Sequence, residues 1–472
     1  MQKNRDTGNY SKREIKIIQC VPVFLSAVLF YLSFPNRVFT FGFWPCIWVF
    51  ALPLLAALQE EPLKNRLALG LFWGLCANGL MAQGLIRISP AGFFAFVLGL
   101  SLQAVIFAGL CRPASSLWAG VCLLPCLWCL SEFLRNYLLG GFSFYISHAL
   151  AFCPPLLKLY GHLGCLGMSF IIFLVNALLY AGVKAKGLAE KKISALCFIA
   201  AVLVFLSVVA AGMMRSAPAG PAARHLSISV IQANISPREK ADPGLFDKNA
   251  ALHLTLTEQS FEKGHPDLVI WPETAFPDDL LQNDQWRTLI TAQALHMNTD
   301  LLLGIAPILE GKEYNSALMI SNLGQIVGLY HKQALVPFAE TVPLAPWGIN
   351  WGRGYRFSPG KKPGIFLLSR TPVLFGVVIC SESAHPDMVR RMRRMGIKFL
   401  VEISNDGWFT DKASSMLHAQ AAILRAVENG IWVIREANTG FSFAVDPEGV
   451  VHTDGNLKLG REGFGIFDIM VQ

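Results

Sequence analysis

The segment Phe375-Gly-Val-Val-Ile-Cys380-Ser-Glu382 is a short apolar run that ends in a thiol and is followed by a carboxylate. A run of this length, rich in β-branched and aromatic residues, predicts a buried β-strand. Folds of the α/β class place their reactive groups at the carboxyl ends of strands. The segment therefore predicts an α/β domain in which Cys380 follows one of the strands.

The sequence on both sides of this segment repeats the pattern. Short β-rich runs alternate with helix-like stretches over residues 225–472, and this alternation predicts that the whole region is one α/β catalytic domain. The expected strands are Leu226–Ile231, Asp267–Trp271, Asp300–Ile305, Ala317–Ser321, Val373–Cys380, Phe399–Ile403, Trp432–Arg435 and Phe441–Val445. The expected helices are Leu245–Lys263, Gln285–His296, Pro386–Met395 and Met416–Asn429.

The first half of the chain has a different character. Of the 472 residues, 53% are hydrophobic and only 15% are charged, whereas soluble domains average about 25% charged residues. Apolar runs of about twenty residues, long enough to cross a bilayer, recur before residue 215. They are Ile15–Phe34, Val38–Leu58, Leu67–Ile86, Ala91–Cys111, Ser115–Leu134, Cys165–Val183 and Ile193–Met214. We predict a helical membrane domain of about seven spans over residues 1–215, joined to the catalytic domain by a small-residue linker at Ser216–Arg224.

The positive charges lie mainly at the ends of the apolar runs. The formal net charge of +8 does not indicate nucleic-acid binding, because the basic residues form no single dense block. An excess of Lys and Arg marks cytoplasmic loops. That excess is carried by Lys3, Arg5, Lys12, Arg13, Lys16, Lys64, Arg66, Arg112, Lys184, Lys186, Lys191 and Lys192. The N-terminus is therefore expected in the cytoplasm, and an odd number of spans places the chain after Met214 outside.

The cysteines do not suggest a disulfide framework. Ten of the eleven lie in the first half, mostly inside apolar runs, and Cys380 has no partner within its own domain. Cys126-Leu-Trp-Cys129 has a redox-like spacing, but it lies in an apolar run without companion His or Cys ligands. These residues are interpreted as small hydrophobic side chains.

Two further segments complete a possible acyl-transfer site. Val269-Ile-Trp-Pro-Glu273-Thr ends a strand in a carboxylate, and Tyr330-His-Lys332 begins a stretch that reaches Glu340. Singly, such residues are usually a capping carboxylate, a surface lysine and a core cysteine. Together they supply a base for a thiol and a cation for an oxyanion. Glu273, Lys332 and Cys380 are therefore the candidate catalytic residues.

These residues, in this order and context, resemble the Glu–Lys–Cys triad of the nitrilase (carbon–nitrogen hydrolase) superfamily. Together with the membrane half, the chain is similar to the apolipoprotein N-acyltransferase family. The other matching segments are Ile231–Asn234, Tyr314–Ser316, Ser404–Phe409, Leu424–Glu428, Arg435–Gly440, Glu132–Arg135 and Gly141–Phe142. The resemblance implies an α-β-β-α sandwich for the second half and a bacterial inner-membrane enzyme with its catalytic domain on the periplasmic side.

The resemblance also implies a reaction. An acyl chain passes from a membrane phospholipid to Cys380 as a thioester, and then to the α-amino group of the N-terminal diacylglyceryl-cysteine of an apolipoprotein. Glu273 would act as general base, and Lys332 with the backbone N–H of Ser381 would stabilise the oxyanion. No metal or organic cofactor is implied. The supporting residues are Glu340, Glu382, Ser381, Asn315, Asn405 and Trp408.

Several positions keep two interpretations. Glu340 and Glu382 either orient Lys332 or the amine, or are structural ion-pair or helix-start carboxylates. His385, close to Cys380 in sequence, is either a dyad partner or, as we favour, a loop histidine. Pro343–Trp351 is either an apolar loop that gates the site or an interfacial anchor.

Two departures from the family bear on substrate contacts and tethering. Ser381 stands where relatives commonly carry an aromatic residue. Relatives commonly add a further C-terminal span, so a chain ending at Gln472 is expected to be tethered on one side.

Three rival functions remain open at this stage. A membrane-tethered nitrilase or amidase would use the same triad with water as acceptor, but a tether needs only one helix. A non-enzymatic scaffold needs no base, cation and thiol in this pattern. A transporter usually carries more ionisable residues inside its spans than Glu132.

Overall fold

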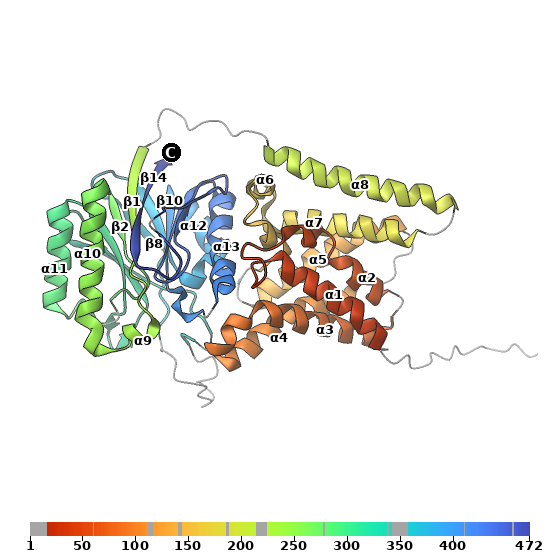
Figure 1. Ribbon diagram of the computed structural model, residues 1–472, viewed down its shortest axis with the longest axis horizontal. Coiled ribbons are helices and arrows are strands. Elements are labelled where there is room, and N and C mark those ends of the chain that lie inside the picture. The colour runs from red at the N-terminus through yellow and green to blue at the C-terminus, as the bar shows by residue number, and fades with distance from the viewer. Residues whose placement is uncertain are drawn as a thin grey trace, which may run out of the picture.

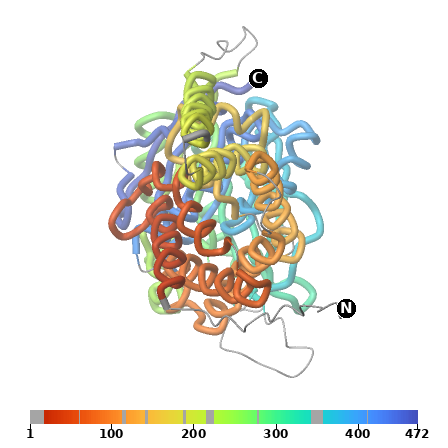
Figure 2. Tube along the Cα trace, turned by 90° about the vertical axis from the view of Figure 1, so that its right-hand side faces the viewer, coloured from red at the N-terminus to blue at the C-terminus, as the bar shows by residue number. Residues whose placement is uncertain are grey.

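A computed structural model describes residues 17–59, 61–111, 117–139, 144–185, 188–213, 224–276, 279–337, 339–341, 357–409, 411–455 and 457–472. Figure 1 shows a helical bundle beside an α/β domain, and Figure 2 shows the helices of the bundle gathered side by side in front of that domain. The predicted fold class, a helical membrane region followed by a nitrilase-like α/β domain, is confirmed.

All seven predicted apolar segments contain helix. The main helices are α1 (Ile17–Ser33), α2 (Ala51–Leu58), α3 (Leu63–Met81), α4 (Pro90–Leu110), α5 (Leu117–Leu138), α7 (Tyr160–Lys184) and α8 (Leu188–Met213). By length and composition, α4, α5, α7 and α8 can each cross a membrane. Short turns η1 (Trp44–Trp48), η2 (Gln83–Arg87), η3 (Ile146–Leu150) and α6 (Pro154–Leu157) lie between them.

The second predicted segment, Val38–Leu58, is wrong as a single continuous helix. Residues 38–43 form a turn, in which the Asn36 side chain accepts hydrogen bonds from the backbone N–H groups of Val38 and Phe39. η1 then begins at Trp44 with Pro45 in its first turn, and α2 follows only from Ala51. Proline lacks a backbone donor and fixes φ, so it favours the first turn of a helix over its interior. The local turn chemistry therefore overrides the hydropathy pattern.

Hydrogen bonds between helix ends define the end of the bundle that lies away from the α/β domain. The Gln19 side chain of α1 donates to Glu61, and Tyr180 of α7 donates to Gln59. The Ser194 hydroxyl of α8 donates to the Gly182 carbonyl of α7 at 2.8 Å. The starts of α1 and α8 thus meet the ends of α2 and α7. Successive helices therefore run in alternating directions through the bundle.

The α/β domain contains two six-stranded sheets. The first has the order β14-β1-β2-β3-β6-β7 and the second β13-β12-β11-β10-β9-β8. Their strands are β1 (Arg224–Gln232), β2 (Leu268–Ile270), β3 (Asp300–Ile305), β6 (Ser316–Ile320), β7 (Ile326–His331), β8 (Gly364–Leu367), β9 (Leu374–Ile379), β10 (Phe399–Ser404), β11 (Trp432–Ala437), β12 (Phe443–Val445), β13 (Val451–His452) and β14 (Gly463–Val471). Each predicted strand is present. β7, β8, β13 and β14 were missed, because they are short or are edge strands with polar or small residues.

The two sheets pack face to face and are flanked by helices. Apolar residues of β1, such as Ile228, and of β9, such as Val377, belong to one buried cluster between the sheets. Helices α10 (Phe246–Gly264) and α11 (Asp284–Met297) cover the outer face of the first sheet, and α12 (Pro386–Arg394) and α13 (Lys412–Asn429) cover that of the second (Figure 1). The result is the α-β-β-α sandwich that the resemblance implied.

The domain is packed against the bundle through α13. One continuous hydrophobic cluster includes Ile172 of α7, Ala422 of α13 and Val378 of β9. Across this junction the Cys165 thiol of α7 donates to the Glu428 carboxylate of α13 at 2.6 Å. Because the apolar core is shared, the catalytic sheet has a fixed position relative to the membrane helices.

Candidate active site

Glu273 lies two residues beyond Trp271, directly after the parallel strand β2. Its Oε1 accepts hydrogen bonds from Asn315 Nδ2 at 2.7 Å and from Lys332 Nζ at 3.5 Å. The neighbouring strand approaches closely at Gly304, where a β-carbon would lie 2.3 Å from the Pro272 carbonyl oxygen. A residue without a side chain at position 304 thus lets the Glu273 turn pack onto β3.

Lys332 follows β7 and is 1% exposed. Its ammonium lies 2.8 Å from Glu340 Oε1, in addition to the contact with Glu273. Burial by itself lowers the pKa of Lys332, but the charges of Glu340, Glu273 and Cys380 outweigh it and raise that pKa well above the usual range. Lys332 is therefore a buried cation at neutral pH, suited to stabilising an oxyanion.

Asn315 and Glu340 fix the relative positions of the Glu273 carboxylate and the Lys332 ammonium. Asn315 Nδ2 bridges Glu273 Oε1 and Glu340 Oε1, the latter at 3.1 Å. Glu340 Oε2 accepts from the backbone N–H of Val336 at 2.7 Å. Glu340 thus forms an ion pair with Lys332, which fits both interpretations given for it, and Asn315 lies between Glu273 and Glu340.

Cys380 begins the turn η6 (Cys380–Ala384) at the end of β9. Its φ of 54° lies in the left-handed region, which costs a non-glycine residue energy and often marks functional turns. The side chain is partly exposed, unlike the strand before it. The fold therefore presents the thiol at the end of β9 in the second sheet, close enough for its charge to act on Lys332, which belongs with Glu273 to the first sheet.

Glu382 fixes the nucleophile turn to the Lys332 segment. Its buried carboxylate accepts from the backbone N–H of Ile379 at 2.8 Å and from the Tyr330 hydroxyl at 2.8 Å. It also accepts from the backbone N–H of Gln333 at 2.6 Å. These hydrogen-bond donors are backbone groups and a tyrosine hydroxyl, as in the structural interpretation of Glu382, while Lys332 acts on this carboxylate through its charge.

Two family models match the two halves of the chain. The model described as Apolipoprotein N-acyltransferase N-terminal domain matches residues 26–178, and the Carbon-nitrogen hydrolase model matches residues 227–469. The apolipoprotein N-acyltransferase of Geobacter metallireducens is 30% identical over 464 residues, covering 93% of this chain and 87% of that protein. The chain belongs to the apolipoprotein N-acyltransferase family.

A second relative carries the same name. The apolipoprotein N-acyltransferase of Allorhizobium ampelinum is 32% identical over 429 residues, covering 84% of this chain and 76% of that protein. Among solved structures, an amidase from Nesterenkonia sp. is 19% identical and covers 54% of this chain and 94% of that chain, with a TM-score of 0.41.

The remaining predicted residues of this family member do not join the triad. Asn405 accepts from the Gly407 N–H at 3.3 Å and from Asn438 Nδ2 at 3.0 Å, so it shapes its own loop. Trp408 is 45% exposed on the short turn η7 (Asp406–Trp408). Ser381 Oγ is buried without a hydrogen-bond partner among the described residues. Pro343–Trp351 and Gly141–Phe142 lie outside the described residues.

A buried charged cluster next to Cys380 was missed by sequence reasoning. Arg435 of β11 binds both Asp406 oxygens, at 3.0 and 2.9 Å, and also Glu402 of β10. His418 of α13 contacts Asp406 at 2.9 Å. One signal was present in the sequence: Glu402 and Arg435 are charged residues inside otherwise apolar strands, where an unpaired charge would be costly.

Proposed function

We propose that this protein transfers an acyl chain from a membrane phospholipid, through a thioester on Cys380, to the α-amino group of the diacylglyceryl-cysteine at the N-terminus of apolipoproteins. The observation that carries the proposal is the placement of the Glu273–Lys332 pair and Cys380 in a sandwich whose helix α13 packs on apolar membrane helices. Membership of the apolipoprotein N-acyltransferase family supports the same acceptor.

The first half-reaction loads the enzyme. Glu273 takes the proton of the Cys380 thiol, and the thiolate attacks the ester carbonyl of the phospholipid. The Lys332 ammonium and the backbone N–H of Ser381 stabilise the tetrahedral oxyanion. The C–O ester bond then breaks, Glu273 returns the proton to the departing alkoxide, and a lysophospholipid leaves.

The second half-reaction transfers the acyl chain from Cys380 to the acceptor amine. The free α-amine of the apolipoprotein attacks the thioester, Glu273 takes the proton of the amine, and the C–S bond breaks as the amide forms. The Cys380 thiolate is released, and Glu273 passes the proton of the amine on to it. Both substrates carry acyl chains, whose transfer to water would cost roughly 0.8 kcal/mol per CH₂. A catalytic domain held at the bilayer surface avoids that cost.

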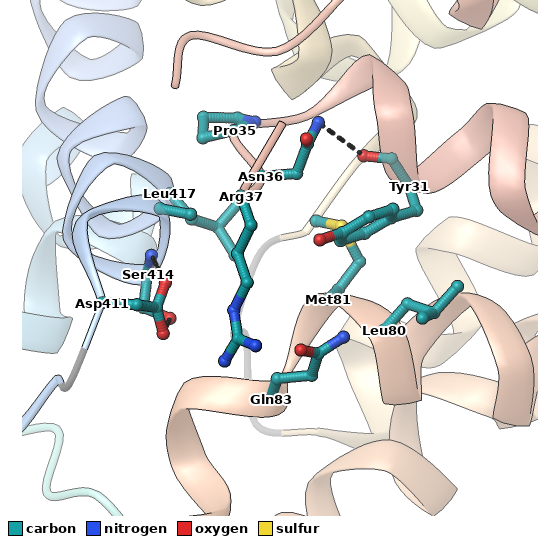
Figure 3. Close-up of a pocket in the computed structure, with 11 residues that line it drawn as sticks. Tyr31, Pro35, Asn36, Arg37, Leu80, Met81, Gln83, Asp411, Ser414 and Leu417 are labelled. Atoms are coloured by element: carbon teal, nitrogen blue, oxygen red, sulfur yellow. Dashed lines mark hydrogen bonds between the residues drawn. The ribbon is translucent and has the colours of Figure 1, made fainter. Parts of the chain in front are cut away.

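The geometry of the junction supports a lipid donor. A recess between the end of α1, the turn after α3 and the start of α13 is lined by Pro35, Arg37 and Gln83 on the bundle side and by Asp411 and Ser414 on the domain side (Figure 3). Arg37 is exposed and points into this recess. A guanidinium is well suited to contact a phosphate, so the head group of a phospholipid is expected near this junction.

The test is intact-mass spectrometry of the full chain after incubation with a defined phospholipid, with Cys380→Ala as control. We expect a mass gain of one acyl chain in the wild type alone, discharged by a diacylglyceryl peptide with a free amine and only slowly by water. Fast discharge by water would favour the membrane-tethered amidase. An adduct on Cys380→Ala, or none on the wild type, would contradict the proposal.

A further inference from the structure

Helix α13 places His418 beside the turn that carries Cys380. Its Nδ1 lies 2.9 Å from Asp406 Oδ1, and its side chain is 13% exposed. The other ring nitrogen, Nε2, has no hydrogen-bond partner among the described residues. Because an ionised carboxylate can only accept, Nδ1 carries a proton and donates a hydrogen bond to Asp406. The nitrogen left to face the thiol is therefore Nε2.

The buried charges around Asp406 indicate that His418 is protonated. The side chains of Glu402 and Asp406 are both at most 1% exposed, and Arg435 forms an ion pair with each of them. Ser415 Oγ and Ser404 Oγ donate to Asp406 at 2.5 and 3.1 Å, but they bring no charge. A second buried carboxylate is costly unless another cation balances it. An imidazolium at His418 supplies that charge.

The electrostatics of the ring agree with this geometry. Burial lowers the pKa of His418, but the negative charge of Cys380 and hydrogen bonds to Asp406 and Cys380 raise it well above the usual range. The charged groups facing Cys380 are Lys332, Arg435 and His418, and those facing His418 are Asp406 and Arg435. Arg435 is also near Glu436 and Glu273.

We propose that His418 is a further catalytic residue: an imidazolium, held by Asp406, that donates a hydrogen bond from Nε2 to the Cys380 thiolate in both half-reactions. The inference rests on the proposed function in taking Cys380 as the nucleophile. The thiol proton still goes to Glu273 and from there to the departing alkoxide. His418 keeps its own proton and stabilises the sulfur before the C–S bond forms and after it breaks. Asp406 is a positioning residue for His418.

The experiment measures alkylation of Cys380 by iodoacetamide between about pH 5.5 and 9.5, because only the thiolate reacts appreciably. The full-length protein in detergent is digested after timed exposure, and the Cys380 peptide is quantified by mass spectrometry. His418→Gln keeps a polar helix-forming side chain but cannot carry the charge. We expect alkylation at pH 6 to slow about tenfold or more, with the two rates converging at high pH.

Two histidine variants serve as matched controls. His452 pairs with Asp446 at 3.1 Å in the same type of contact, but its strand β13 is separated from β9 by three strands. His452→Gln should leave the profile unchanged, as should His385→Gln, which tests the neighbouring histidine. His418→Asn retains a donor toward Asp406 and provides a second variant if the glutamine form does not fold.

The outcomes separate this inference from the proposed function. An unchanged pH profile in a folded His418 variant would overturn the role of His418, even if the wild type still forms the acyl adduct. A missing acyl adduct in the wild type would overturn the proposed function, whatever the alkylation profile shows. If His385→Gln, and not His418→Gln, shifted the pH profile of alkylation, His385 would be the residue that stabilises the Cys380 thiolate.

Discussion

At the scale of single residues, Lys332 is expected to contribute both to the stability of the fold and to the rate of acylation. Its ammonium lies between Glu273 and Glu340, and replacing it by Met leaves a buried and a partly buried carboxylate, bridged by Asn315, without their cation. We expect Lys332→Met to lower the acylation rate about 10²–10³-fold, as loss of one oxyanion donor does. Single-turnover acylation, followed by intact mass, measures this rate.

A positive charge at position 332 is not expected to be sufficient for acylation, because the shape of the side chain also matters. Lys332→Arg keeps the charge, but its planar group does not fit a site that is 1% exposed, so it should rescue little. Lys263→Met, at an exposed lysine over the Phe464 ring, should acylate at the wild-type rate. Because the pKa of Lys332 is raised in the folded state, its stabilising contribution is present at neutral pH and is lost only as the pH rises through that raised value. Full activity in Lys332→Met would contradict the oxyanion role.

At the scale of elements, α13 connects the membrane helices to the nucleophile turn. Arg425 donates to the Ser383 carbonyl at 3.3 Å and pairs with Glu428 at 2.9 Å, while Glu428 accepts from Cys165 of α7. Arg425→Met would leave Glu428 buried and unpaired, so we expect a loss of about 3–5 kcal/mol in the free energy of unfolding. Denaturant titration in detergent measures it.

The chain offers a matched control for this ion pair. Arg390 and Asp387 on α12 form an exposed pair with the same i, i+3 spacing, at 2.7 Å. Arg390→Met should change the free energy of unfolding by less than about 1 kcal/mol. If both substitutions lowered the free energy of unfolding equally, the buried pair on α13 would stabilise the fold no more than the exposed pair on α12 does.

At the scale of the whole molecule, the alternating helix directions place the basic loops at one end and the α/β domain at the other. Lys64 lies in the first turn of α3, and Lys184 and Lys191 lie where α7 ends and α8 begins, away from the domain (Figure 1). By the positive-inside rule this end is cytoplasmic, so the catalytic domain is expected on the periplasmic side. In intact spheroplasts, a membrane-impermeant maleimide should label Lys361→Cys and not Lys191→Cys, with the parent chain as background. The reverse labelling would invert the topology.

The sequence by itself determined the membrane half and the α/β class, and it predicted Glu273, Lys332 and Cys380 as the candidate catalytic residues. Each of these leaves a local trace: an apolar run long enough for a bilayer, or a reactive residue at the end of a strand. Only the tertiary structure decided that Asn315 bridges Glu273 and Glu340, that α13 docks on α7, and that Arg435 and His418 both bind Asp406. Those pairs depend on how distant segments pack, as with Cys165 and Glu428, 263 positions apart, and local periodicity carries no information about such contacts.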